Sequence, residues 1–122
     1  MTDGKAAEDA VDEYLQSQGY RMIARNLRLK QGEIDWLGWQ GDILTLVEVK
    51  ASKVSPELAA GRIDTRKLNR LQHLMEELLT LEPYRKVIEY RILAIIAFKA
   101  GSEQGWEFSE FVCMGGQGES DG

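Results

Sequence analysis

The sequence predicts a single α/β domain in which a mixed central β-sheet is flanked by helices, in the order α-β-β-β-α-β-β. Two stretches, residues 6–18 and 64–81, carry apolar residues at helical spacing. Two β-rich runs joined by a Gln-Gly-Asp turn indicate a β-hairpin between these helices. A run at 87–98 is apolar on both faces, which is typical of a central strand covered by helices. A chain of 122 residues can bury one such core but not a second.

The first helix is expected from Ala6 to Gln18, with acidic residues in its first half and Gly19 closing it. Its apolar stripe comprises Ala7, Val11, Tyr14 and Leu15. Glu8 falls on that stripe, three residues before Val11. Two interpretations of Glu8 remain open: an acid close to a metal ion, or an acid favoured near a helix N-terminus by the helix dipole.

A first strand is expected from Tyr20 to Leu27, and residues 26–30 lead from it into the hairpin. Arg25 and Arg28 are candidates for contacts to a nucleic-acid backbone. Exposed cations on an edge strand also prevent edge-to-edge pairing of sheets, which is a second explanation for both residues.

The hairpin is predicted to carry charged residues inside its apolar pattern. Its segments are residues 32–37, the break at 40–42, and residues 43–50. Side chains alternate between the two faces of a strand. Glu33 and Asp35 therefore share one face of the first strand, and Glu48 and Lys50 share one face of the second.

Folding the hairpin about Gly41 is expected to place Glu48 opposite Glu33 or Ile34, with Asp35 as a diagonal neighbour. Three carboxylates and an ammonium group then gather at the open end of the hairpin. Like charges repel at this distance, and burying a charge without a partner costs several kcal/mol. A divalent cation would relieve that repulsion.

Oxygen ligands of this kind favour Mg²⁺ or Mn²⁺. One or two carboxylates are typical of Mg²⁺ sites, so Asp35, Glu48 and the Val49 carbonyl would be sufficient protein ligands. Lys50 would then lie beside a metal-bound water. The alternative is a surface ladder of salt bridges, because an E-x-K triplet is common in a chain as charged as this one.

After the hairpin, residues 51–61 are expected to form a loop or a short helical turn beside the site. The long helix of residues 64–81 has a suitable N-cap in Asp64. Lys67 and Arg70 lie in its first two turns and would favour a phosphate if that end faces the open hairpin. Ordinary solvation of a charged helix face explains them equally well.

The apolar run at 87–98 is expected to return by a right-handed crossover and to lie beside the strand that carries Glu48. A last strand at the edge of the sheet is expected from Trp106 to Met114. Residues 115–122 are rich in Gly and acids, which predicts a disordered tail after a domain of residues 1–114.

Composition restricts the class of protein. One Cys and one His exclude a disulfide framework and a Cys/His zinc site within the chain, which favours the reduced cytoplasm. No signal peptide or membrane span is predicted. The net charge of −5 opposes nucleic-acid binding, but residues 21–70 hold ten Lys and Arg against six Asp and Glu, or +4, which leaves −9 elsewhere.

The motifs G-E-I-D, at residues 32–35, and L-V-E-V-K, at residues 46–50, resemble the signature of the uncharacterised bacterial YraN-type family. That family is similar to the PD-(D/E)xK, or restriction-endonuclease-like, nuclease superfamily. The resemblance extends from Ala7-Glu8 to Lys67 and Leu71. It implies a restriction-endonuclease-like fold.

Carried over residue by residue, the resemblance implies that Asp35 and Glu48 bind the metal, that Lys50 is catalytic, and that Glu8 is an accessory acid. Gln31 and Ser52 stand where the family commonly has basic residues. Both differences remove potential contacts to phosphate.

The leading hypothesis is therefore a Mg²⁺- or Mn²⁺-dependent nuclease that hydrolyses phosphodiester bonds in DNA or RNA. A non-catalytic module of the same fold, which binds nucleic acid or a partner protein, is the alternative. A structural subunit with a salt-bridged hairpin is the third reading. Nucleic acid is the expected partner, no membrane association is expected, and assembly as a homodimer is left open.

Overall fold

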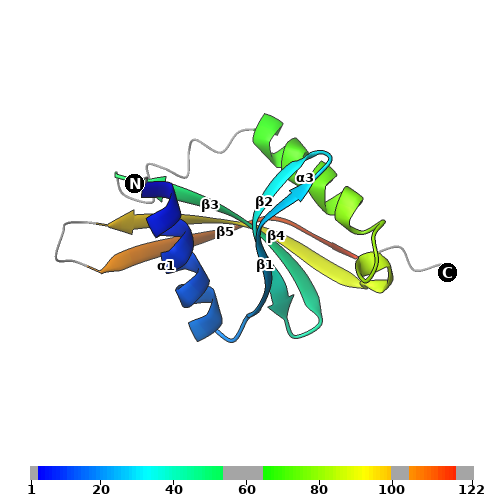
Figure 1. The fold of residues 1–122 in the computed structure, drawn as a ribbon, viewed down its shortest axis with the longest axis horizontal. Coiled ribbons are helices and arrows are strands. Elements are labelled where there is room, and N and C mark those ends of the chain that lie inside the picture. Colours follow the sequence, from blue (N-terminus) through cyan, green and yellow to red (C-terminus); the bar gives the residue numbers. More distant parts are fainter. Residues whose placement is uncertain (1–2, 54–64, 100–104, 118–122) are drawn as a thin grey trace.

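Five strands form one mixed sheet that carries a helix on each face. The computed structural model describes residues 3–53, 65–99 and 105–117. The elements are α1 (Asp3–Ser17), β1 (Arg21–Leu29), β2 (Gly32–Gln40), β3 (Ile43–Ser52), α3 (Thr65–Leu78), the 3₁₀ helix η1 (Tyr84–Lys86), β4 (Glu89–Lys99) and β5 (Trp106–Gln117) (Figure 1). The strand order is β1-β2-β3-β4-β5, with β3 and β4 parallel and the other pairs antiparallel. The predicted fold class is confirmed, and the arrangement is consistent with a restriction-endonuclease-like fold.

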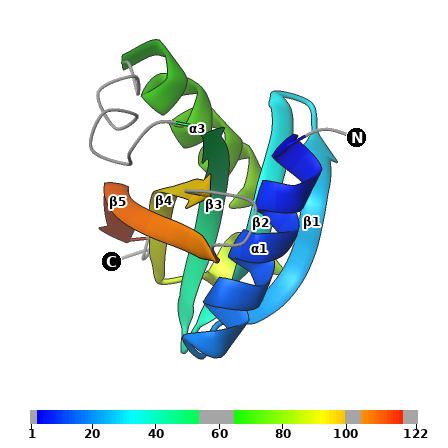
Figure 2. The ribbon, with the colours of Figure 1, turned by 90° about the vertical axis from the view of Figure 1, so that its left-hand side faces the viewer.

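Each helix packs its apolar stripe on one face of the sheet (Figure 2). Under α1, the fully buried residues include Ala7, Val11, Leu15, Trp36, Val47 and Ile95. Under α3, they include Leu71, Leu74, Leu78, Ile34, Leu37, Leu46 and Ile92. The burial of these apolar side chains on both faces of the sheet is the main source of stability for such a domain.

The helices end close to where the sequence predicts. α1 begins at Asp3, earlier than expected, and ends at Ser17, where Gly19 adopts a φ of +94° that favours glycine and turns the chain away. Asp64 lies outside the described residues, and α3 ends at Leu78, three residues before the predicted end. No helix among the described residues is long and apolar enough to cross a lipid bilayer.

The boundaries of the strands differ from the predicted ones more than the boundaries of the helices do. β3 continues through Ser52, so the first two residues of the predicted loop at 51–61 belong to the strand, and residues 54–61 lie outside the described part of the chain. β5 runs to Gln117, so Gly115 and Gly116 are part of a strand instead of the expected tail. They pair with β4, whose central residues 92–97 are buried.

The register of the β2–β3 hairpin corrects the expected one. Gln40 pairs with Ile43, so the turn contains two residues, Gly41 and Asp42, instead of three. The φ of +60° at Gly41 suits the first central position of a type II′ turn, which matches the twist of the strands. The pairing runs down to Trp36 opposite Val47.

This register decides which acids meet. Glu48 follows Val47 and comes level with Asp35, the residue before Trp36, and not with Glu33 or Ile34. A shift of this size changes the neighbour of every side chain along the strand.

Candidate metal and phosphate site

Asp35 occupies the point where the β2–β3 ladder ends. Beyond the pair of Trp36 and Val47, toward the open end of the hairpin, these two strands form no further backbone pair. The Val49 N–H instead donates a hydrogen bond of 2.8 Å to Oδ2 of Asp35. The carboxylate thus replaces the missing backbone acceptor, and this bond fixes its position at the open end of the hairpin.

Glu48 lies beside Asp35 on the face covered by α3. Its side chain is only 12% exposed, and two cations from the first turns of α3 contact the same oxygen. Lys67 Nζ lies 3.0 Å and Arg70 Nη2 lies 3.4 Å from Glu48 Oε2. The N-terminal end of α3 therefore does face the open hairpin, and it balances the charge of a half-buried acid.

Asp35 and Glu48 lie level on adjacent strands, close enough for the charge of Glu48 to raise the pKa of the Asp35 carboxyl group. Burial is the largest cause that raises the pKa of Asp35, and the negative charges of Glu48 and Glu8 act in the same direction, so that the pKa of this carboxyl group reaches about 7. The hydrogen bond from Val49 N–H opposes these effects. Two acids in such contact repel each other when both are ionised.

Glu8 reaches the same region from α1. Its Oε1 accepts a hydrogen bond of 3.1 Å from Asn26 Nδ2. Asn26 has a φ of +53°, a conformation that Asn tolerates better than most residues, and lies level with Asp35 in the neighbouring strand. Within residues 3–53, 65–99 and 105–117, however, no three His, Cys, Asp or Glu side chains gather closely enough to hold a metal ion. The tight pair is Asp35 and Glu48, with Glu8 farther out.

Lys50 lies two residues beyond Glu48 on the α3 side of β3 and is half-buried. Among the described residues, no carboxylate lies within ion-pair distance of its ammonium group. Lys67, in contrast, already contacts Glu48. Of these two lysines at the same end of the sheet, Lys67 is the one that pairs with Glu48.

The remaining predicted cations lie elsewhere. Arg25 contacts α1, with Nη2 2.7 Å from Asp9 Oδ1 and Nη1 4.0 Å from Asp12 Oδ2. Arg28 is 77% exposed, and its Nη2 lies 3.9 Å from Oε2 of Glu33. Of the four candidate nucleic-acid contacts, only Lys67 and Arg70 contact the carboxylate pair.

A contact that the sequence did not predict fixes the turn before β2. Glu77, on α3, accepts hydrogen bonds of 2.8 and 2.9 Å from the main-chain N–H groups of Lys30 and Gln31. This pair of bonds ties α3 to the β1–β2 turn. An acid on a helix face carries no sequence signal for such a role.

The raised pKa of Asp35 predicts how stability changes with pH. An acid whose pKa rises from 3.8 to about 7 on folding binds more protons in the folded state. The metal-free protein should therefore lose stability as the pH rises from 3.8 to about 7, with a constant deficit above that range. After allowance for solvent screening we expect a change on the order of 1–2 kcal/mol.

Urea denaturation at several pH values, with Asp35→Asn as the reference, separates the contribution of Asp35 to the pH dependence of stability from the contributions of the other titrating groups. The difference between the two free energies of unfolding should grow through this pH range, with the variant the more stable protein at high pH. A difference that does not change with pH would contradict the raised pKa.

Comparison with known proteins gives a consistent family. A profile described as "Uncharacterised protein family UPF0102" matches residues 7–98, which run from α1 to β4. A UPF0102 protein of Dictyoglomus thermophilum is 31% identical over 107 residues, covering 86% of this chain and 91% of that protein. One from Symbiobacterium thermophilum is 40% identical over 84 residues, covering 66% and 71% respectively. These names record no activity, and the matched segment includes the carboxylate pair and Lys50.

Proposed function

The chain belongs to the uncharacterised protein family UPF0102, and from that premise we propose that it is a Mg²⁺- or Mn²⁺-dependent nuclease that hydrolyses phosphodiester bonds in DNA or RNA. The match agrees with the resemblance of its G-E-I-D and L-V-E-V-K motifs to the YraN-type family. One observation carries the proposal. Asp35 and Glu48 lie level on adjacent strands at the open end of the hairpin, and Lys50 lies two residues beyond Glu48 on the same strand.

The side chains present fit a divalent cation. Two carboxylates in contact repel each other when ionised, and a cation between them relieves that repulsion. Asp35, Glu48 and the main-chain carbonyl of Val49 would hold the ion, since Mg²⁺ commonly takes one or two carboxylates and completes its coordination with water and substrate phosphate. When bound, the ion supplies Lewis acidity toward the phosphate and lowers the pKa of water.

The chain's own residues act on the phosphate and on the attacking water. Hydrolysis adds the oxygen of water to phosphorus, breaks the bond to one sugar oxygen and releases a proton. The Lys50 ammonium group orients the water or stabilises the extra negative charge on the phosphate. Lys67 and Arg70, already at the site through Glu48, attract the phosphodiester and hold it in place.

A second candidate function is a binding module without catalysis. The ion pairs of Glu48 with Lys67 and Arg70 favour it, because two cations already compensate that carboxylate without a metal. In that case nucleic acid should bind without being cut. A gel-shift that weakens steeply with salt identifies such binding, and binding that is insensitive to salt indicates a protein partner.

Cleavage of labelled single-stranded, duplex and branched DNA and RNA with Mg²⁺ or Mn²⁺ tests the proposed activity. The Lys50→Ala variant should lose about 10²- to 10⁴-fold in the rate of cleavage, the usual size of a general acid–base contribution. Its binding of Mn²⁺, followed by electron paramagnetic resonance, should be retained because the two carboxylates remain.

Arg85→Ala is the matched control. It also removes one positive charge, but Arg85 pairs with Glu82 at the C-terminal side of α3, away from the carboxylates. Undiminished cleavage by Lys50→Ala would exclude Lys50 from the mechanism. No cleavage of any substrate by the natural sequence would favour the binding module.

A further inference from the structure

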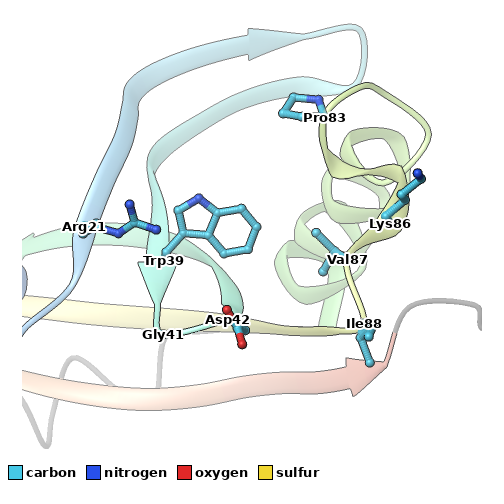
Figure 3. A pocket seen from close by; sticks show the side chains of 8 residues that line it. All are labelled: Arg21, Trp39, Gly41, Asp42, Pro83, Lys86, Val87 and Ile88. Carbon is cyan, nitrogen blue, oxygen red and sulfur yellow. The ribbon is translucent and has the colours of Figure 1, made fainter.

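A cavity lies at the opposite end of the sheet from Asp35 and Glu48. It has a volume of about 450 Å³, and its lining includes Arg21, Trp39, Asp42, Lys86, Val87 and Ile88 (Figure 3). We refer to it as the Trp39 pocket. Trp39 pairs with Leu44. Leu44 precedes Glu48 by four residues, which corresponds to about 13 Å along β3. The two sites are therefore separate.

Three parts of the chain build the pocket. Arg21 lies directly opposite Trp39 across β1 and β2, and its guanidinium group points toward the indole (Figure 3). Asp42 comes from the β2–β3 turn, and Val87 and Ile88 lead from η1 into β4. The volume lies within the range of small-molecule sites.

The lining carries unpaired positive charge. Arg21 and Lys86 are exposed, and among the described residues neither lies within ion-pair distance of a carboxylate. Nearby cations differ: Arg85 pairs with Glu82 at 3.0 Å, and Arg91 donates a hydrogen bond of 2.8 Å to Gln40. Two cations and one acid, Asp42, give the lining a net charge of +1 in a chain of net charge −5. Such a local excess attracts an anion.

The indole distinguishes this cavity from an ordinary basic patch. Trp36 is buried and donates its Nε1–H to Asp12, and Trp106 lies under the Lys99 ammonium group at 5.6 Å. Trp39 is half-buried and lines the pocket, so part of its ring is available to a ligand. Aromatic side chains in such positions stack on nucleic-acid bases.

We propose that the Trp39 pocket binds a nucleotide unit, with its base stacked on Trp39 and its phosphate held by Arg21. Lys86, on the opposite rim, adds positive potential. Asp42 accepts a hydrogen bond from an exocyclic amino group of the base, as carboxylates do from cytosine, which favours cytosine over uracil. This site does not depend on the proposed nuclease activity, because it needs no metal and shares no residue with the carboxylate pair.

Nuclear magnetic resonance titration of the full chain in EDTA with CMP, and separately with UMP, tests the proposal. The indole N–H signal that disappears in the Trp39→Phe variant is thereby assigned to Trp39. CMP should shift that signal and leave the Trp36 and Trp106 signals unchanged. UMP should bind several-fold more weakly, since it offers Asp42 no amino group.

Two variants of exposed residues separate the contacts. Arg21→Ala should weaken the binding of CMP about tenfold, the usual effect of losing one charge-assisted hydrogen bond. Asp42→Ala should remove the preference for CMP over UMP. Arg85→Ala, one residue before Lys86 and already paired with Glu82, is the control and should bind CMP as the natural sequence does.

A short oligo(dC) distinguishes the two sources of this chemistry. Binding more than tenfold tighter than that of CMP identifies a nucleotide within a strand, and equal binding identifies a free nucleotide. No shift of the Trp39 signal at millimolar CMP, or unchanged affinity in Arg21→Ala, would overturn the proposal. The titration contains EDTA and therefore no free divalent cation, so a failure to bind CMP would not count against the proposed nuclease activity. In the same way, an absence of cleavage would not count against nucleotide binding in the Trp39 pocket.

Discussion

The Asp35→Asn variant is expected to lose cleavage by at least about a thousandfold and also to lose its thermal response to Mn²⁺. Removing one of two carboxylates halves the charge that holds the cation, and that cation is expected to supply several kcal/mol of transition-state stabilisation. The fold should survive because the Asn Oδ1 can still accept the hydrogen bond from Val49 N–H. Thermal melts with and without Mn²⁺, together with the cleavage assay, measure both effects.

The same substitution separates a metal site from a structural one. Without metal, Asp35→Asn should melt at a higher temperature than the natural sequence at pH 8, since the repulsion from Glu48 is gone. Glu89→Gln, which removes an exposed acid at the opposite end of the sheet, should change neither property. The reading of the hairpin as a structural, salt-bridged element would be favoured if the variant melted at a lower temperature than the natural sequence and if Mn²⁺ changed the melting temperature of both proteins equally.

The second large effect is expected from Gly38→Ala, which should destabilise the fold by about 3 kcal/mol or more, the upper range for overpacking a core. A Cβ atom at Gly38 would lie 2.3 Å from Cη2 of Trp36 and 2.4 Å from the main-chain oxygen of Arg21. Trp36 is 1% exposed and cannot move aside, and the Arg21 oxygen belongs to the neighbouring strand. Such a loss is a large part of the total stability of a small domain.

Urea denaturation measures this loss. Gly115→Ala is a matched control within the same sheet, because a Cβ atom there would meet nothing within 4 Å. The control should differ from the natural sequence by less than about 1 kcal/mol. Equal stabilities of the two variants would show that β2 shifts to accommodate the methyl group, contrary to the packing around Trp36.

The helices and strands could be predicted well from the sequence, because the type of each element depends on the spacing of apolar residues within a short segment. Apolar spacing along residues 6–18 and 64–81 specifies two amphipathic helices, and each buries the predicted stripe. The parallel pairing of β4 with β3 follows from a helix lying between two strands. The motifs of the hairpin also identify the family, since they require only residue types at fixed spacing.

The site could be predicted only in part. Charged residues inside an apolar hairpin indicate that something must compensate them, and the sequence names Asp35 and Glu48 for this reason. Their contact depends on the register, which the φ of Gly41 sets through a two-residue turn. A turn longer by one residue would have directed Asp35 away from Glu48.

Contacts between distant segments depended on how the helices dock. The position of α3 on the sheet brings Lys67 and Arg70 to Glu48, and the position of α1 engages Arg25 with Asp9. Nothing in the spacing of these cations distinguishes the two outcomes. The Trp39 pocket likewise needs β1, the hairpin turn and η1 in one place.

The chain's sequence was therefore sufficient for its helices, its strands, its family and the acids that must be compensated, because each follows from neighbouring residues. The folded molecule alone determined the partner of each charge, the raised pKa of Asp35 and the cavity beside Trp39. Those properties arise from distances between residues far apart in the chain, which register and helix docking set.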